Sequence, residues 1–136
     1  MIEYAHTPIR PDLWDSVSGY FQMAVDKTQN KDWMLADMLG WLNQGMGLLL
    51  INKDEGKINS AAIVEAIPHH RTLVLRIHVM GAEKHTDWMT NFDELTRWAK
   101  AEGYTSITGE GRHAWPRVLE KQGYEVKKIT GFEVVL

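Results

Sequence analysis

The segment from Thr72 to Tyr124 constrains the fold most, because strand, turn, helix, strand and short helix follow one another there with clear boundaries. Thr72–Met80 has the two-residue period of a strand. Leu73, Leu75, Ile77 and Val79 are predicted to lie on one face, and Val74, Arg76, His78 and Met80 on the other. Gly81 and Ala82 then interrupt the pattern, so we expect this strand to end at Met80.

A helix is predicted after the strand. Thr86 or Asp87 can cap its first turn, and Gly103 can close it. Its apolar residues recur at helical spacing: Trp88, Phe92, Leu95 and Ala99. Thr105–Gly109 then has the composition of a short strand. The pattern predicts two parallel strands joined by a crossover helix.

Ligands of such a unit bind at the carboxyl ends of its parallel strands. Here those ends are Met80–Ala82 and Gly109–Arg112. We therefore expect the functional site at this edge of the sheet.

The remaining elements are predicted from apolar periodicity and turn residues. They are a short strand at Ile2–Ala5, a helix from about Pro11 to Lys27, a helix beginning near Asp32, strands at Met46–Lys53 and Ile58–Ile67, a helix at Trp115–Lys121, and strands at Tyr124–Thr130 and Phe132–Leu136. Asp54-Glu55-Gly56 is typical of a hairpin loop between the second and third of these strands in the chain. The 136 residues are expected to form a single domain, 1–136.

The composition limits the classes of partner and of metal site that can be expected. The net charge is −3 with both signs interspersed, so no basic face is expected for nucleic acid or an anionic membrane. The absence of cysteine excludes disulfides and thiolate metal sites, and His69-His70 has no partner at ligand spacing, so no metal site is expected. The longest apolar run, Leu48–Ile51, is too short to span a bilayer, and Met1–Glu3 is unlike a signal peptide. A cytoplasmic setting is the expectation.

The order of elements, together with the segment Gly111–Tyr124, resembles the GNAT acyltransferase family. In that family a short helix ends in Glu-Lys-x-Gly-Phe before the sixth strand, and Glu120, Lys121, Gly123 and Tyr124 match this pattern. A degenerate phosphate loop, a tryptophan opening the third helix and a Gly-Arg before the fourth resemble small GNAT-like proteins of bacteriophages. The resemblance implies an α/β GNAT-like fold, with a mixed, mainly antiparallel sheet flanked by about four helices.

The resemblance also implies acetyl-CoA as a cofactor. In the family, amides of the loop after the fourth strand hold the pyrophosphate at a helix amino terminus, where adjacent glycines allow close approach. This chain keeps only Gly81 of that motif. Ala82 follows it, and the hydroxyl of Thr86 is expected to help bind the phosphates, while Ile77, Val79 and Met80 of the strand are expected to line the pantetheine arm. The alternative for Gly81 is a tight turn.

Two residues are candidates for the general base that removes the proton from an acceptor amine. Glu110 stands at the carboxyl end of the second parallel strand, and a partly buried carboxylate can serve as a base. His78 lies on the polar side of the first parallel strand, although a histidine there can simply be satisfied by a neighbouring strand. The family often places a proton-donating tyrosine where this chain has Leu119, which cannot donate.

Two functions of different class follow. The first is an acetyl-CoA-dependent N-acetyltransferase with a degenerate pyrophosphate loop, whose partner is a small-molecule acyl-CoA. The second is a non-catalytic GNAT-fold phage protein, acting as a virion component or as a binder of a host protein through a surface rich in its six tryptophans. The corresponding locations are the host cytoplasm or the virion. The sequence leaves the acceptor and the oligomeric state open.

Overall fold

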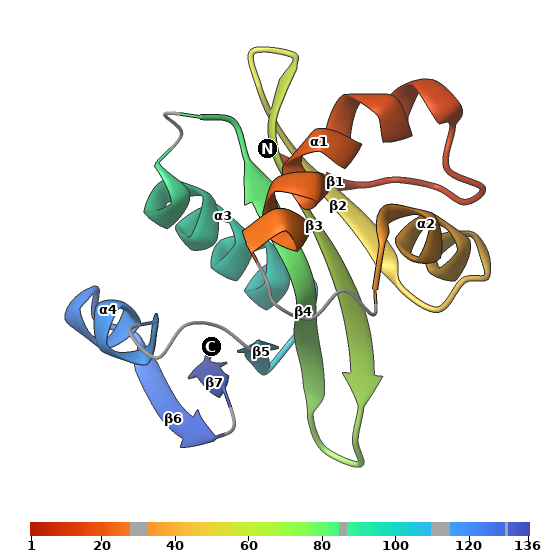
Figure 1. The fold of residues 1–136 in the computed structure, drawn as a ribbon. Coiled ribbons are helices and arrows are strands. Elements are labelled where there is room, and N and C mark those ends of the chain that lie inside the picture. Colours follow the sequence, from red (N-terminus) through yellow and green to blue (C-terminus); the bar gives the residue numbers. More distant parts are fainter. Residues whose placement is uncertain (28–32, 85–86, 110–114, 130) are drawn as a thin grey trace.

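The computed structural model describes the chain except for residues 28–32, 85–86, 110–114 and 130 (Figure 1). In chain order the elements are β1 (Ile2–Tyr4), α1 (Pro11–Lys27), α2 (Leu35–Asn43), β2 (Leu48–Asp54), β3 (Lys57–Pro68), β4 (Leu73–Ala82), α3 (Trp88–Ala101), β5 (Ser106–Gly109), α4 (Trp115–Lys121), β6 (Glu125–Ile129) and β7 (Gly131–Val135). The seven strands form one sheet in the order β1-β2-β3-β4-β5-β7-β6.

The pairing of the strands is mainly antiparallel. Strands β1 to β4 form an antiparallel meander, and β7 pairs antiparallel with both β5 and β6. Only β4 and β5 run parallel, and α3 connects them as the predicted crossover. The predicted fold class, an α/β fold with a mixed and mainly antiparallel sheet, is therefore confirmed.

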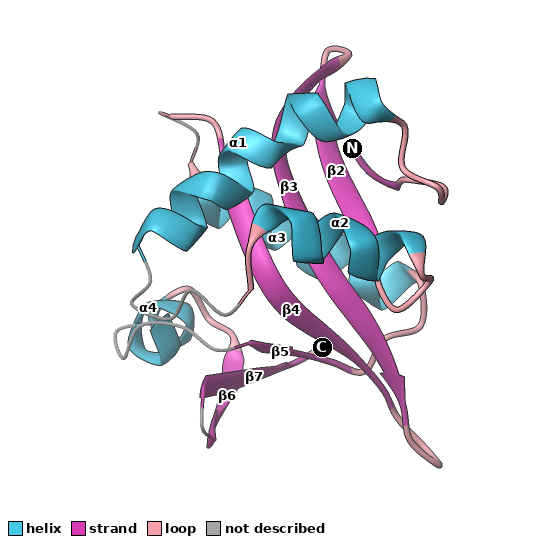
Figure 2. Cartoon of the chain, turned by 45° about the vertical axis from the view of Figure 1, so that its right-hand side comes forward, coloured by secondary structure: helices cyan, strands magenta, loops and turns pink. Residues whose placement is uncertain are grey.

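Two layers of helix cover the sheet, and each layer has its own apolar cluster. Helices α1 and α2 pack on one face against Leu49, Ile51 and Ile63, and α1 crosses in front of the strands in Figure 2. Helices α3 and α4 pack on the other face, where Phe92 and Leu119 join Leu75. The sheet thus separates two cores. The carboxyl-terminal strands and α4 form a group at one end of it (Figure 1).

Local signals in the sequence explain several boundaries. The β2–β3 hairpin turns at Glu55 and Gly56, whose φ angles of 51° and 79° are both in the left-handed region. Two such residues in succession suit the twist of a tight hairpin. Asp87 caps α3, accepting a hydrogen bond at 3.0 Å from the Met89 amide. Gly103, at φ 92°, follows the carboxyl end of this helix as predicted.

Strand β4 is longer than predicted. It continues through Gly81 and Ala82, which pair with Ala61 and Ser60 of β3, so the predicted end at Met80 is wrong. The reason is that the long β3 offers hydrogen-bonding partners to both residues. A glycine signal in the sequence marks a break only where no neighbouring strand continues the ladder.

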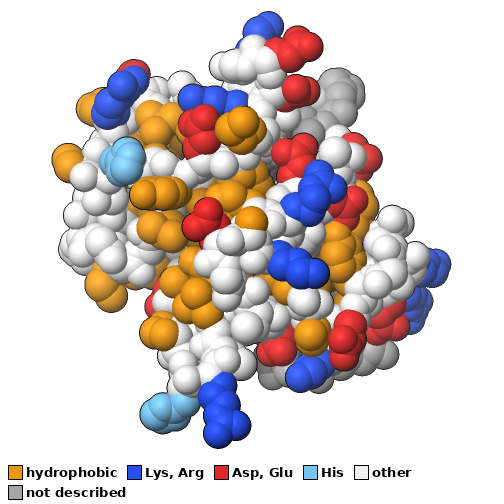
Figure 3. All heavy atoms as spheres, turned by 180° about the vertical axis from the view of Figure 1, so that it is seen from behind, with side chains coloured by type: hydrophobic (Ala, Val, Ile, Leu, Met, Phe, Trp, Pro, Cys, Tyr) orange, Lys and Arg blue, Asp and Glu red, His pale blue; other side chains and the backbone are white. Residues whose placement is uncertain are grey.

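The surface carries no dominant sign of charge in the view of Figure 3, where Lys and Arg side chains alternate with Asp and Glu around a central group of apolar side chains. None of the described helices is both long enough and apolar enough to cross a membrane.

Candidate active site

The two parallel strands, β4 and β5, pair with each other over only part of the length of β4. Their pairing runs from Val74 and Ser106 to Ile77 and Gly109, where β5 ends. Strand β4 continues to Ala82. Beyond Ile77, therefore, β4 extends past the end of β5, at the sheet edge where the sequence predicted the site.

A β-bulge interrupts β4 at the same level. Ile63 of β3 pairs with Val79, and the next residue, Val64, pairs with Ile77, which leaves His78 as the extra residue of β4. A bulge bends its strand and resets the alternation of side chains. Val79 consequently packs in the α1/α2 cluster, while Met80 joins Ile77 in the α3/α4 cluster.

The bulge corrects one prediction from the sequence. Strict alternation placed Val79 with Ile77 and placed Met80 with His78, but both assignments are wrong. Because the register shift follows from the pairing with β3, the apolar pattern of β4 alone contains no sign of it. Of the three residues expected along the pantetheine, Ile77 and Met80 share one face and Val79 lies on the opposite face.

His78 has a polar partner and two aromatic neighbours. Its Nε2 lies 2.9 Å from Oε1 of Glu65 on β3. The centroid of its ring lies 4.9 Å from that of Trp41 and 5.7 Å from that of Trp33, and the two indoles are 5.7 Å apart. We call Trp33, Trp41, Glu65 and His78 the bulge cluster. The sequence reasoning named only His78 of these four.

A weak signal could have pointed to the other members. Glu65 is the one charged residue in the apolar run Ala61–Ile67 of a predicted strand, and Trp33 and Trp41 are eight residues apart, about two helical turns. Neither pattern says which strand residue they meet. That contact depends on how α2 lies on the sheet.

Trp41 also packs closely against Gly47. A Cβ at Gly47 would lie 2.0 Å from Cζ3 of Trp41 and 2.8 Å from the carbonyl oxygen of Val64. Only glycine leaves room for the indole at this point. Trp41 thus contacts both the backbone before β2 and the ring of His78, which limits the positions that its own ring can take.

Gly81 is required by packing, which differs from both roles that the sequence suggested. It lies within β4, and a Cβ there would be 2.5 Å from the carbonyl oxygen of Tyr20 and 2.7 Å from its Cβ. Helix α1 therefore approaches β4 closely over this residue. Neither a tight turn nor a phosphate-binding loop is needed to explain the glycine.

The described residues after β4 do not form a ready anion site. The amide of Glu83 already donates to the carbonyl oxygen of Asn59 at 2.8 Å. The carboxylate of Asp87 occupies the first turn of α3, where Thr90 also donates to it at 2.9 Å. A negative charge capping a helix repels a second anion from the same helix end. These residues do not fit a pyrophosphate; Thr86, expected to help bind it, lies outside the described part of the chain.

Glu83 is engaged with α1. Its Oε1 accepts a hydrogen bond at 2.8 Å from the hydroxyl of Tyr20, which is 9% exposed. Burial first, and then the hydrogen bond and charge of Glu83, raise the pKa of Tyr20 to about 12. The contact ties the start of the β4–α3 loop to the middle of α1.

This contact predicts a loss of stability in strong alkali. An unfolded tyrosine ionises near pH 10, whereas folded Tyr20 resists ionisation up to about pH 12. Its contribution is therefore complete below pH 10 and is lost as the pH rises through 12, by about 2–3 kcal/mol. Urea unfolding of the wild type and of Tyr20→Phe from pH 8 to pH 12 should show the wild type losing more stability. Equal pH dependence of the two proteins would contradict the assignment.

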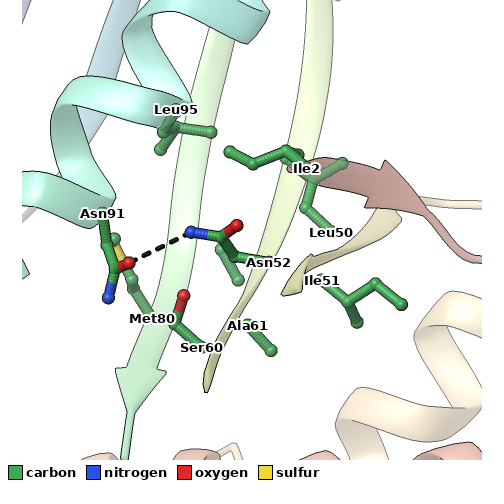
Figure 4. Close-up of a pocket in the computed structure, with 10 residues that line it drawn as sticks. Ile2, Leu50, Ile51, Asn52, Ser60, Ala61, Met80, Asn91 and Leu95 are labelled. Carbon is green, nitrogen blue, oxygen red and sulfur yellow. Dashed lines mark hydrogen bonds between the residues drawn. The ribbon is translucent and has the colours of Figure 1, made fainter. Parts of the chain in front are cut away.

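A second pair of polar side chains, Asn52 and Asn91, is buried on the face of the sheet that α3 and α4 cover (Figure 4). The side chain of Asn52 donates to Oδ1 of Asn91 on α3 at 3.0 Å, and both residues are buried. They border a cavity of about 20 Å3, which is room for one water molecule. The Nδ2 of Asn91 has no partner among the described residues, so a water here would satisfy it. A cavity of this size is too small to hold a substrate.

The remaining sequence candidates divide into two groups. Glu110 lies outside the residues that the structure describes. Leu119 is fully buried with Phe92 in the α3/α4 cluster, where it serves packing. The structure therefore brings together one predicted catalytic residue, His78, with partners that the sequence did not reveal.

Solved structures with the same arrangement are acetyltransferases. A possible acetyltransferase from Clostridium difficile 630 is 14% identical, with a TM-score of 0.65 over 95% of this chain and 97% of its own. Ribosomal-protein-alanine N-acetyltransferase from Brucella melitensis is 18% identical, with a TM-score of 0.58 over 100% and 99%. A GNAT family acetyltransferase from Elizabethkingia anophelis, solved with acetyl-CoA bound, is 12% identical, with a TM-score of 0.56 over 94% and 77%.

Sequence comparison gives no corresponding match: no protein-family model and no curated protein matches the chain. The likeness is thus one of fold, carried by the order and pairing of the strands and by the helices that cover them. The chain has the fold of the GNAT acetyltransferases.

Proposed function

We propose that this protein transfers an acyl group from a thioester donor such as acetyl-CoA to a primary amine, with His78 as the general base. One observation carries the proposal: the bulge places His78, paired with Glu65, where β4 extends beyond β5. A base held by a carboxylate, on a strand that extends beyond its parallel neighbour, is an arrangement suited to acyl transfer to an amine. The fold shared with acetyltransferases supports it.

The tautomer of His78 assigns the basic atom. A carboxylate only accepts hydrogen bonds, so Nε2 carries the hydrogen that Glu65 accepts, and Nδ1 keeps its lone pair. As the amine nitrogen attacks the thioester carbonyl carbon and forms the N–C bond, its proton passes to Nδ1. The C–S bond breaks with its electron pair on sulfur, and the proton leaves His78 for the thiolate through water. The products are an amide and a thiol.

A donor is expected to be held mainly by its thioester arm. The strand edge of β4 presents backbone groups that amides of a pantetheine can pair with. In contrast, Asp87 and Glu83 disfavour the pyrophosphate. The thiolate needs no acid in contact with it, because thiols ionise near pH 8.5 and leave readily, and Leu119 would supply none.

The second candidate, a non-catalytic protein of the same fold, is favoured by a different observation. The Asp87 carboxylate at the start of α3 and the buried Leu119 both remove features that an acetyltransferase of this fold would use. In that case a partner protein takes the place of the donor. The two candidates differ in whether a thioester binds at all.

The experiment is a thermal-shift titration with acetyl-CoA and with S-acetylpantetheine, followed by an assay of thiol release with a panel of amines. A ligand at a hundredfold its dissociation constant adds about 2.7 kcal/mol, which is a shift of several degrees for a domain of this size. We expect both donors to raise the melting temperature, with the two affinities within about tenfold. If millimolar concentrations of both donors produce no shift, the acyltransferase proposal fails and the non-catalytic candidate stands.

A further inference from the structure

Glu65 and the two tryptophans of the bulge cluster provide a surface whose chemistry selects the acceptor. We propose that the acceptor is a cationic primary amine carried on a planar apolar group, bound by Trp33, Trp41 and Glu65 beside His78. This inference rests on the proposed function, because it names the substrate class of the same site.

The aromatic side chains come from α2, which carries Trp41, and from the segment just before it, which carries Trp33. Trp33 and Trp41 are only partly buried, although they meet edge to face at 5.7 Å and cover the ring of His78 from the helix side. Indoles left partly open beside a candidate base offer an apolar surface to a planar group and a negative ring face to a cation.

The charged part comes from β3. The side chain of Glu65 is 36% exposed, and its carboxylate lies against the imidazole of His78. A carboxylate in this position attracts an ammonium group and holds it beside the imidazole of His78. The ammonium gives one proton to solvent before its nitrogen, now neutral, attacks the thioester. Arg76 lies opposite Glu65 in the strand register, so an acidic ligand is the alternative that the test must exclude.

The bulge explains why these groups lie together. It turns His78 toward α2, while Ile77 and Met80 remain on the α3/α4 face. The acceptor surface and the extension of β4 beyond β5 consequently meet at a single residue, His78. This is the geometry that a base needs when it serves an amine on one side and a thioester on the other.

The test measures binding of phenethylamine by isothermal titration calorimetry in the absence of any donor. Three matched ligands separate the contributions: phenethyl alcohol lacks the charge, butylamine lacks the ring, and 3-phenylpropionate reverses the charge. We expect phenethylamine to bind at least about fivefold more tightly than each of them. Tighter binding of 3-phenylpropionate, or equal binding of all four, overturns the proposal.

Variants locate the site. Glu65→Gln should weaken phenethylamine about fivefold and leave phenethyl alcohol unchanged, and Trp33→Phe should weaken both. Trp98→Phe is the matched control. It alters a ring that stacks on Tyr104 in the α3/α4 cluster, so it should change the affinity for neither phenethylamine nor phenethyl alcohol. Phenethylamine binding that survives Glu65→Gln and Trp33→Phe together overturns the assignment.

The two proposals fail in different ways. Binding is measured without a donor, so loss of amine selectivity does not depend on catalysis. If phenethylamine and butylamine release thiol with equal kcat/KM, transfer stands and the acceptor class is wrong. If the amine binds as expected and no donor shifts the melting temperature, the acyltransferase proposal fails while the amine site stands.

Discussion

Replacing His78 by glutamine should lower kcat for acyl transfer by about 100- to 10,000-fold, the range of a lost general base. Glutamine keeps a side-chain NH that Glu65 can accept, so the bulge cluster should stay folded, but its amide cannot take a proton from the amine. The rate of thiol release at saturating donor and acceptor measures the effect. Donor affinity by thermal shift should change little, because the lost interaction belongs to the transition state.

His70→Gln is the matched control for this variant. His70 is exposed at the turn between β3, which carries Glu65, and β4, which carries His78. Its replacement should leave kcat within about twofold. If His78→Gln retains the wild-type rate while His70→Gln behaves as expected, the base lies elsewhere, and Glu110→Gln becomes the variant to measure.

Gly81→Ala should destabilise the protein by about 1–3 kcal/mol, as overpacking of a close contact does. The new Cβ would stand 2.5 Å from the carbonyl oxygen of Tyr20, which is backbone in the middle of α1. A flexible side chain could move aside, but a helix backbone moves only with the whole helix. Urea unfolding followed by circular dichroism, with the wild-type m-value as the check on two-state behaviour, measures the loss.

Gly19→Ala is the control. It also adds a methyl group to a glycine in this region, but the opposite effect on stability is expected. Gly19 lies within α1, and a Cβ there has nothing within 4 Å. Alanine should therefore stabilise the helix by roughly 0.5–1 kcal/mol. Equal stability of Gly81→Ala and the wild type would contradict the close packing of α1 on β4.

The expected loss of stability at Gly81 makes this position unsuitable for testing cofactor binding. A bulky residue there would disturb the contact of α1 with β4, so loss of a thermal shift in that variant would not identify a phosphate-binding loop. Asp87→Asn is the sharper probe, since it removes the charge at the start of α3 and keeps a capping side chain. A gain in acetyl-CoA affinity in that variant would support our account of the pyrophosphate.

Much of the fold follows from local patterns in the sequence. The order of helices and strands, the hairpin at Glu55 and Gly56 and the crossover from β4 to β5 were all predicted and are confirmed, and Asp87 is the cap of the two that the sequence offered. Each depends on the properties of a few neighbouring residues: which backbone angles they tolerate, which hydrogen bonds their side chains offer and how often an apolar residue recurs.

The arrangement of the candidate site depends on contacts between segments that are far apart in the sequence. The bulge at His78 exists because β3 and β4 pair out of step by one residue, and the two strands' own sequences are compatible with a regular ladder. The meeting of Trp41 with His78 and the approach of Tyr20 to Gly81 depend on where α1 and α2 lie on the sheet. The sequence determined the elements and one candidate base; only the packing of helices and strands determined which side chains surround that base, because side-chain neighbours across a sheet are set by register and helix placement together.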